Sequence, residues 1–236
     1  MRIVIALLAL VILAGVAPAQ YPRGVVAEDA TATWCQYCPY AYEGLEVMKA
    51  RYDATEFNAI RYYATSGGLG TTETNGRISY YNIGGFPTVM FDGTIAVVGG
   101  SAEIATGSSY DPIVAKNIGQ PSPFHIQINS VDVAYPDGSV NFDVIVEEAL
   151  ADIGNVKIRA MLLENNVPWG SSDIMQDVTR DVLPDVVLTV SQLGQTQNVQ
   201  ASFPLDAAWK TNDLWLAILI QDDDDKSILQ SRSSRP

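Results

Sequence analysis

Histidine and cysteine are scarce in this chain, whose 236 residues include one histidine and two cysteines. A zinc site with two histidine ligands is therefore excluded, and two cysteines cannot build a disulfide-rich miniprotein. Basic residues are also few: 14 Lys and Arg face 27 Asp and Glu, which gives a net charge of -13. Nucleic-acid binders need basic patches that displace counterions, so we exclude a nucleic-acid partner. With 47% hydrophobic residues the chain is too apolar to be disordered, and its length suits one large or two small domains.

A membrane-spanning length of apolar sequence is missing at the N-terminus, because the apolar run over residues 3–13 is shorter than the roughly 20 residues required. Arg2 precedes this run, and the small residues Ala17 and Ala19 follow it, as in a secretory signal peptide. We expect residues 1–19 to be a signal peptide, with a membrane anchor as the alternative. The mature chain would then have no membrane span. It would be secreted or periplasmic, with association with the outer membrane left open, in an oxidising compartment where disulfides persist.

The apolar periodicity divides the rest of the chain into two parts. Residues 21–118 change period several times and predict strands that alternate with helices. The expected order is strand, helix, strand, helix, two strands and a last helix, over residues 24–29, 41–52, 58–65, 72–82, 87–92, 94–98 and 102–116. Two prolines within residues 119–123 predict a linker. Residues 124–232 alternate with period two between turn signals, which is typical of a β-sandwich.

Both cysteines lie in one short segment, Trp34-Cys35-Gln36-Tyr37-Cys38-Pro39, where a predicted strand gives way to a helix. A helix that begins near Cys35 would favour its thiolate, because free backbone N–H groups and the positive end of the helix dipole act on the sulfur. Cys35 would then be the exposed attacking sulfur, and the more buried Cys38 would resolve the mixed disulfide.

Two other interpretations of the cysteine pair stay open. A structural staple over so short a loop would contribute only about 2 kcal/mol to the free energy of unfolding. Half of a zinc site would need further ligands, but there is no other cysteine, and His125 lies in the other part of the chain.

A second segment, Gly85-Phe86-Pro87-Thr88, opens an apolar strand with a proline that cannot donate to a sheet, and a cis Phe86–Pro87 bond would resolve this conflict. Trp34 to Pro39 resembles the active-site motif of the thioredoxin superfamily, and Gly85 to Thr88 resembles its cis-proline loop. The resemblance covers about residues 21–118. It implies an α/β thioredoxin-like domain there, and the period-two pattern adds an all-β, Ig-like sandwich domain after it.

The resemblance also implies roles for individual residues. Cys35 would be the nucleophile, Cys38 the resolving thiol, and Pro87 the residue that lies against the disulfide. Substrate-positioning roles fall to three neighbouring residues: Trp34, Phe86 and Thr88. The backbone beside Pro87 would pair with an extended substrate segment. Gln36 and Tyr37 stand where thioredoxins usually have Gly-Pro and would tune the reduction potential, so the sequence leaves oxidant or reductant open.

An acidic residue precedes the cysteines where thioredoxins carry a buried acid, since Asp29 lies six residues before Cys35. A carboxyl group buried in an apolar strand has a raised pKa and can exchange a proton with Cys38 near neutral pH. Glu28 is the adjacent candidate. Because neighbouring residues of a strand point to opposite faces, only one of the two acids can act. Alternatively, both are solvated at the strand end.

A secreted thioredoxin-like domain joined to a β-sandwich also resembles a group of bacterial outer-membrane and secreted proteins, in the strand endings Leu163-Glu164-Asn165 and Leu219 to Ser231. We expect an enzyme, a secreted or periplasmic thiol–disulfide oxidoreductase that acts on protein thiols and disulfides with an unidentified electron-transfer partner. The dithiol carries both electrons, so we expect no organic cofactor and no metal. The alternative is a non-catalytic secreted or outer-membrane-associated binding protein on the same scaffold.

Other segments invite functional interpretations. Asp222 to Lys226 is acidic but lacks the spacing of an EF-hand, so we expect a charged hairpin tip. Ser66 to Gly70 lacks the Lys-Ser/Thr of a phosphate loop and predicts a turn. His125 is expected to be half-exposed in a sheet. The long segment Pro168 to Asp185, with Trp169, is a candidate binding surface, but nothing in it identifies a ligand.

Overall fold

The computed structural model describes residues 21–235, so the predicted signal peptide over residues 1–19 lies outside the described residues. Nine strands form one large mixed sheet, in the spatial order β16-β15-β9-β12-β3-β2-β4-β5, with β13 paired to β9. In chain order these strands are β2 (Val25–Thr31), β3 (Phe57–Tyr63), β4 (Thr88–Phe91), β5 (Ile95–Val98), β9 (Val156–Glu164), β12 (Val178–Val182), β13 (Val186–Val187), β15 (Leu214–Asp222) and β16 (Ile228–Ser233).

A second sheet of three strands, in the order β14-β8-β7, forms a separate layer. Its strands are β7 (Phe124–Asp132), β8 (Asp137–Val146) and β14 (Thr196–Pro204). Two short pairs complete the strands, β1 (Tyr21–Pro22) with β6 (Pro121–Ser122), and β10 (Val167–Trp169) with β11 (Asp173–Met175). The helices are α1 (Cys38–Arg51), α2 (Thr72–Tyr80), α3 (Ala102–Ala105) and α4 (Asp111–Asn117), with 3-10 turns at Thr65–Gly67 and Thr211–Asp213.

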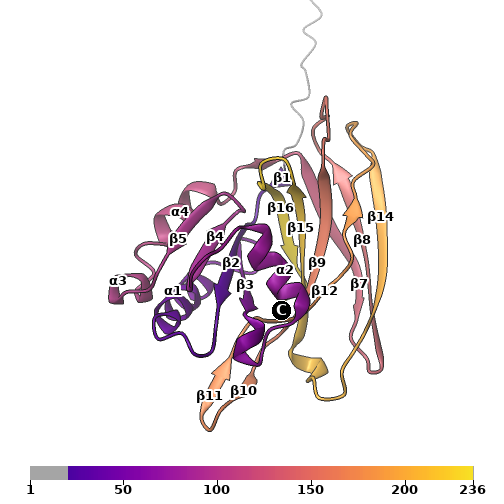
Figure 1. Cartoon of the computed structure of the whole chain (residues 1–236). Coiled ribbons are helices and arrows are strands. Elements are labelled where there is room, and N and C mark those ends of the chain that lie inside the picture. Colours follow the sequence, from indigo (N-terminus) through magenta and orange to yellow (C-terminus); the bar gives the residue numbers. More distant parts are fainter. Residues whose placement is uncertain (1–20, 236) are drawn as a thin grey trace, which may run out of the picture.

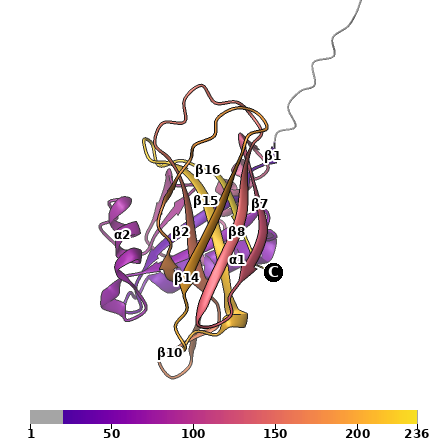
Figure 2. The ribbon, with the colours of Figure 1, turned by 90° about the vertical axis from the view of Figure 1, so that its right-hand side faces the viewer.

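The layers are visible side by side in Figure 1, with α1, α3 and α4 on the left and the three-stranded sheet on the right. Figure 2 shows β14, β8 and β7 as the outer layer that faces the viewer. Each interface between layers has its own apolar cluster. One lies between α1 and β2, β3 and β4, a second between α2 and the sheet, and a third between β9 and β15 and the three-stranded sheet.

This architecture corrects the predicted fold class. The expectation of an α/β thioredoxin-like domain followed by an all-β, Ig-like sandwich domain is wrong, because the structure is β-rich, with 42% strand and 19% helix. Strands from both parts of the chain also belong to one sheet, where Val178 of β12 pairs with Arg61 of β3 in parallel. Period-two alternation predicts a strand but not its neighbour, and pairing satisfies the backbone groups that β3 would otherwise expose at an edge. The domain boundaries at residues 119–123 stay a prediction.

Many local predictions agree with the structure. The strands predicted at residues 24–29 and 58–65 correspond to β2 and β3, which run parallel from Val25 beside Phe57 to Thr31 beside Tyr63. The predicted hairpin is present as antiparallel β4 and β5, with Gly93 at positive φ in its turn. These agreements concern single elements, whose patterns are local.

Two helix boundaries differ from the prediction. The helix expected over residues 102–116 is split into α3 and α4, because Gly107 adopts a φ of +76° between them and Pro112 occupies the first turn of α4. Helix α1 begins at Cys38 instead of near Cys35, with Pro39 in its first turn. A proline has no N–H to donate, and the first turn of a helix leaves such donors unpaired in any case.

The C-terminal part also tests two single-segment predictions. Asp222 to Lys226 forms the turn between β15 and β16, as predicted, although Asp223 is paired with Arg159 by an ion pair of 2.8 Å. The segment Pro168 to Asp185 is not a simple loop, since it contains β11 and β12. Within residues 21–235, no helix combines the length and apolar character needed to cross a membrane.

Candidate functional site

Cys35 and Cys38 form a disulfide in the connection between β2 and α1. The chain turns tightly there, because the Cys35 N–H donates to the carbonyl of Ala32 at 3.1 Å and the Cys38 N–H donates to the carbonyl of Cys35 at 3.3 Å. Cys35 is 9% exposed and Cys38 is 5% exposed. The difference has the predicted direction but is small, so Cys35 is less exposed than the sequence suggests.

The loop around Pro87 lies beside this disulfide. The Phe86–Pro87 peptide bond is cis, as predicted, and Phe86 packs against a buried cluster formed by Ala32, Cys35, Cys38 and Ala64. Pro87 is buried, and its carbonyl accepts a hydrogen bond from the Gly99 N–H at 2.8 Å. The backbone of Phe86 makes no hydrogen bond within residues 21–235. An extended peptide therefore finds an unpaired backbone segment next to the disulfide.

The three residues expected to position a substrate have different surroundings. Trp34 is 62% exposed, and its ring centroid lies 6.0 Å from that of Phe86 in an edge arrangement. The Trp34 indole N–H donates to the Ser66 hydroxyl at 3.1 Å, which holds the exposed ring in place. Thr88 is buried, and its hydroxyl donates to the carbonyl of Gly85 at 2.9 Å, so it supports the proline loop from inside. Trp34 and Phe86 thus share one surface, whereas Thr88 faces the interior.

Gln36 and Tyr37, the two residues between the cysteines, are both exposed. Tyr37 is 52% exposed, and Tyr40, one turn further on, is 38% exposed. Together with Trp34 they are exposed aromatic residues within five positions of the disulfide cysteines along the chain. Large exposed apolar groups that gather in one place are typical of a surface that binds a partner.

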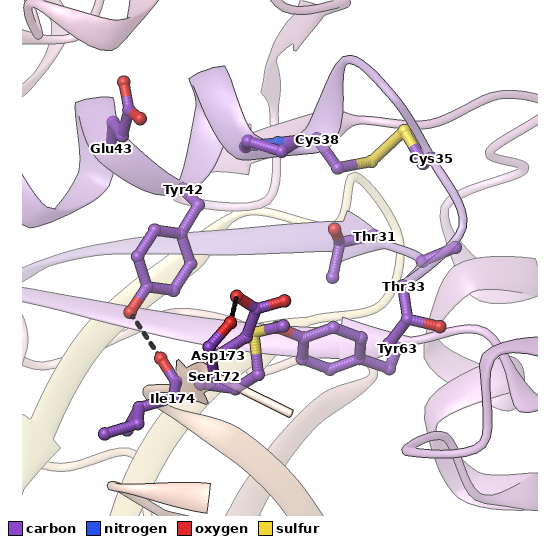
Figure 3. A pocket seen from close by; sticks show the side chains of 13 residues that line it. Thr31, Thr33, Cys35, Cys38, Tyr42, Glu43, Tyr63, Ser172, Asp173 and Ile174 are labelled. Atoms are coloured by element: carbon purple, nitrogen blue, oxygen red, sulfur yellow. Dashed lines mark hydrogen bonds between the residues drawn. A yellow bond between two sulfur atoms is a disulfide. The ribbon is translucent and has the colours of Figure 1, made fainter. Parts of the chain in front are cut away.

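A cleft of about 410 Å³ opens beside the disulfide (Figure 3). Thirteen residues line it: Thr31, Ala32, Thr33, Cys35, Cys38, Pro39, Tyr42, Glu43, Tyr63, Ser172, Asp173, Ile174 and Met175. The first part of the list belongs to β2, β3, α1 and their connections, and the last four residues belong to the β10–β11 hairpin. The Tyr42 hydroxyl donates to the carbonyl of Ile174 at 3.5 Å and so bridges the two sides. The two cysteines are therefore reached from solvent through this cleft.

Asp29 lies in the middle of β2, on the same strand face as Thr31 of the cleft. It is fully buried, and neither carboxylate oxygen has a hydrogen-bond partner within the described residues. Its nearest cation is Arg61, whose Nε lies 3.8 Å from Asp29 Oδ2. Burial raises the pKa of Asp29 from 3.8 to about 7, against the opposing pull of Arg61. The carboxyl group can therefore exchange a proton near neutral pH, as the sequence-based hypothesis requires.

Glu28 is buried as well, but on the opposite face of β2. Its Oε1 accepts from the Tyr62 hydroxyl at 2.8 Å and from the Arg77 guanidinium, and its Oε2 accepts from the Tyr81 hydroxyl. This acid therefore belongs to an interior network beneath α2, away from the strand face that leads to the cleft. Neither acid is solvated at a strand end, so that alternative is wrong.

Arg61 is a buried residue of this site that the sequence analysis missed. Its guanidinium contacts Asp177 at 2.7 Å and Glu46 at 2.8 Å, and Lys49 contacts the same Asp177 carboxylate at 2.6 Å. Burial alone would lower the pKa of Arg61, but these carboxylates and Asp29 raise it above its ordinary value. The available signal was an arginine inside a strand of mostly apolar and aromatic residues, Phe57 to Tyr63. A buried cation needs acidic partners, and one of them comes from a distant segment.

His125 is partly buried in β7, stacked on Tyr21 at a centroid distance of 3.8 Å, far along the chain from the cysteines. Residues 21–235 contain no group of three His, Cys, Asp or Glu side chains that could hold a metal ion. The groups at this site that can exchange electrons or protons include the disulfide and the buried carboxyl of Asp29.

Comparison with known proteins relates the fold to one solved structure. No protein-family model and no curated protein sequence matches the chain. HBP35 of Porphyromonas gingivalis is similar to it with a TM-score of 0.71 and 17% sequence identity, over 91% of this chain and 75% of that chain. A β-glucosidase from Kluyveromyces marxianus matches in two structures, one of them in complex with glucose.

The β-glucosidase matches are weak. Their TM-scores are 0.28 and 0.27, at 14% and 12% identity, over 56% and 52% of this chain and 17% and 16% of theirs. Similarity at that level carries no argument. The likeness to HBP35, at its low identity, shows a shared fold alone.

Proposed function

We propose that this protein is a thiol–disulfide oxidoreductase that exchanges disulfides with protein substrates through Cys35 and Cys38. The observation that carries the proposal is the position of the disulfide: both cysteines line an open cleft, and their chain neighbours Trp34 and Tyr37 are exposed. A structural role explains the bond poorly, because a disulfide over so short a loop contributes only about 2 kcal/mol to the free energy of unfolding.

The exchange conserves atoms and electrons in two steps. A substrate thiolate attacks the Cys35 sulfur, the bond between the two cysteine sulfurs breaks, and Cys38 leaves as a thiolate. A second substrate thiolate then attacks the substrate sulfur of the mixed disulfide and releases Cys35 as a thiolate. The substrate dithiol has lost two electrons and two protons, the protein disulfide has gained two electrons, and its thiolates take up protons. The reverse sequence reduces a substrate disulfide, with Cys35 as nucleophile and Cys38 as resolving thiol.

Asp29 fits the role of proton relay for Cys38 in this cycle. Its pKa of about 7 lets it accept a proton from a thiol near neutral pH and return it in the reverse direction. Its place on the same strand face as Thr31, which lines the cleft together with Cys38, supports this role.

The cysteine motif and the proline motif both resemble those of the thioredoxin superfamily, and this resemblance supports the same chemistry. The layout of residues 1–19 supports secretion or a periplasmic location, where disulfide exchange with protein substrates is useful. The low exposure of Cys35, at 9%, favours the alternative of a binding protein with an idle disulfide. The test below separates the two.

Turnover and trapping with paired cysteine variants test the proposal. Wild-type protein is expected to catalyse the reduction of insulin disulfides in the presence of a small thiol, and Cys35→Ser is expected to lower the rate to that of the small thiol alone. Cys38→Ser is the matched variant, because it keeps the nucleophile but cannot resolve. It should accumulate a mixed disulfide with the substrate, detected by mass spectrometry at Cys35. Absence of any Cys35-dependent exchange in the wild type would refute the oxidoreductase and leave the binding protein.

A further inference from the structure

The β10–β11 hairpin forms the side of the cleft that lies opposite the disulfide. In Figure 3 the Asp173 carboxylate is drawn between the rings of Tyr42 and Tyr63, below the cysteines, and Glu43 projects from α1. Asp173 is exposed, and its one hydrogen-bond partner among the described residues is the neighbouring Ser172 hydroxyl at 3.5 Å. It is therefore available to a ligand.

The base of this hairpin is fixed to the core beside the disulfide. Directly after β11, the carbonyl of Gln176 accepts from Arg61 Nη1 at 2.9 Å, and Asp177 pairs with the same guanidinium at 2.7 Å. On the other strand, the Trp169 ring packs on Gly68, where an added Cβ would lie only 2.7 Å from it. These contacts hold both strands of the hairpin and so fix the place of Asp173 at the cleft.

The charge of the cleft has one sign. Of its thirteen described lining residues, none is Lys, Arg or His, while Glu43 and Asp173 are acidic. The remaining lining is largely apolar or aromatic, with Tyr42, Ile174 and Met175 facing the same space. A ligand that fits both features has an apolar stem and a positive end, which describes the side chains of lysine and arginine.

We infer that the β10–β11 hairpin selects the substrate: the cleft accepts an extended cysteine-bearing protein segment with a lysine or arginine near the cysteine, whose charge pairs with Asp173. The inference rests on the proposed function, since the cysteine of that segment must reach Cys35. The unpaired backbone of Phe86 pairs with the extended segment, and Asp173 pairs with its basic side chain.

Single-cysteine peptides activated with thionitrobenzoate test this inference in the full chain carrying Cys38→Ser. The Cys35 thiolate attacks the peptide sulfur, forms a mixed disulfide and releases the coloured thionitrobenzoate anion, so the rate is read directly. Two peptides differ only in a lysine or a glutamate close to the cysteine, and mass spectrometry confirms the adduct. We expect the lysine peptide to react about fivefold faster at low salt, the size of effect that exposed ion pairs produce, and the ratio to fall as salt is added.

Variants of the hairpin complete the test. Asp173→Asn should bring the ratio close to one, and Asp173→Lys should reverse it, while Asp137→Asn, an exposed acid on β8, should leave it unchanged. Equal rates for both peptides with the native hairpin, or a preference that survives Asp173→Lys, would overturn the inference and leave the oxidoreductase standing. Failure of both peptides to form a Cys35 adduct would instead refute the proposed function itself.

Discussion

Glu28 and Asp29 are neighbours on β2 and are equally buried, yet their carboxylates have different hydrogen-bond partners on the two faces of the strand. The Glu28 carboxylate accepts hydrogen bonds from one guanidinium and two tyrosine hydroxyls. The Asp29 carboxylate accepts none within the described residues and has one cation at 3.8 Å. Adjacent acids of similar chemistry therefore differ because the strand directs one beneath α2 and the other toward α1 and the cleft.

The difference separates a structural acid from a functional candidate. A buried charge with all its partners stabilises one arrangement of the surrounding elements, and the Glu28 network joins α2 to β15 through Gln221, which accepts from Arg77 at 3.1 Å. A buried carboxyl without partners destabilises the fold when it ionises, so its presence requires another explanation. Proton transfer at the disulfide is the explanation that we propose for Asp29.

The largest expected effect comes from changing Glu28, the acid whose carboxylate accepts hydrogen bonds. Glu28→Gln removes the counter-charge of Arg77 and leaves a buried guanidinium unpaired, which should lower the free energy of unfolding by about 3–5 kcal/mol. Urea denaturation followed by circular dichroism measures this loss. The double variant Glu28→Leu with Arg77→Met removes both charges and should recover most of it. A loss below about 1 kcal/mol for the single variant would mean that the network contributes no more than a surface pair.

Asp29→Asn, on the other face of β2, is expected to stabilise the protein, because an asparagine side chain does not ionise. Because the folded pKa is raised from 3.8 to about 7, the folded protein binds more protons than the unfolded chain between these values, and wild-type stability falls as pH rises. The variant lacks this loss. The free energy of unfolding of Asp29→Asn should therefore rise relative to that of the wild type by up to about 4 kcal/mol between pH 4 and pH 8. The difference grows by about 1.4 kcal/mol for each pH unit.

Denaturant titrations of both proteins at a series of pH values measure the Asp29 effect. The wild-type slope should be confined to the window from about pH 4 to pH 7 and should flatten above it, since both states are then ionised. Parallel curves for Asp29→Asn and the wild type would contradict the raised pKa.

The smallest expected effect is kinetic and asks whether the acids differ in function as they do in stability. In the wild type, the rate at which a preformed mixed disulfide at Cys35 decays should rise with pH, with an inflection near pH 7. At that pH Asp29 becomes able to accept the Cys38 proton. Asp29→Asn should remove this inflection and slow the decay at pH 7.5 on the order of a hundredfold, the lower range of general acid–base catalysis.

Tyr81→Phe is the matched control for the kinetic experiment, because it perturbs the Glu28 network without touching the Asp29 face. It should keep the inflection near pH 7. An inflection that persists in Asp29→Asn would exclude the relay, whereas its loss in both variants would mean that the two faces are coupled.

Local features of the site were predictable from the sequence, and their partners were not. The cis Phe86–Pro87 bond follows from a proline at the start of an apolar strand, and the disulfide joins the two cysteines of one short motif. By contrast, Arg61 meets Asp177 across more than a hundred residues of chain, an ion pair of 2.7 Å that no local pattern encodes. The side of the cleft that carries Asp173 belongs to the segment Pro168 to Asp185. The sequence indicated a binding surface in this segment but did not indicate that it lies opposite the disulfide.

The sequence by itself determined the candidates for the proposed chemistry: two cysteines three positions apart, a proline loop, and a pair of acids on one strand. The tertiary structure alone decided that β12 continues the sheet beyond β3, that a distant hairpin forms one side of the cleft, and that the Asp29 carboxylate has no hydrogen-bond partner among residues 21–235. The physical reason is that periodicity and turn residues act over a few neighbours. Strand order and buried ion pairs depend instead on long-range contacts, which form only when the whole core is buried together.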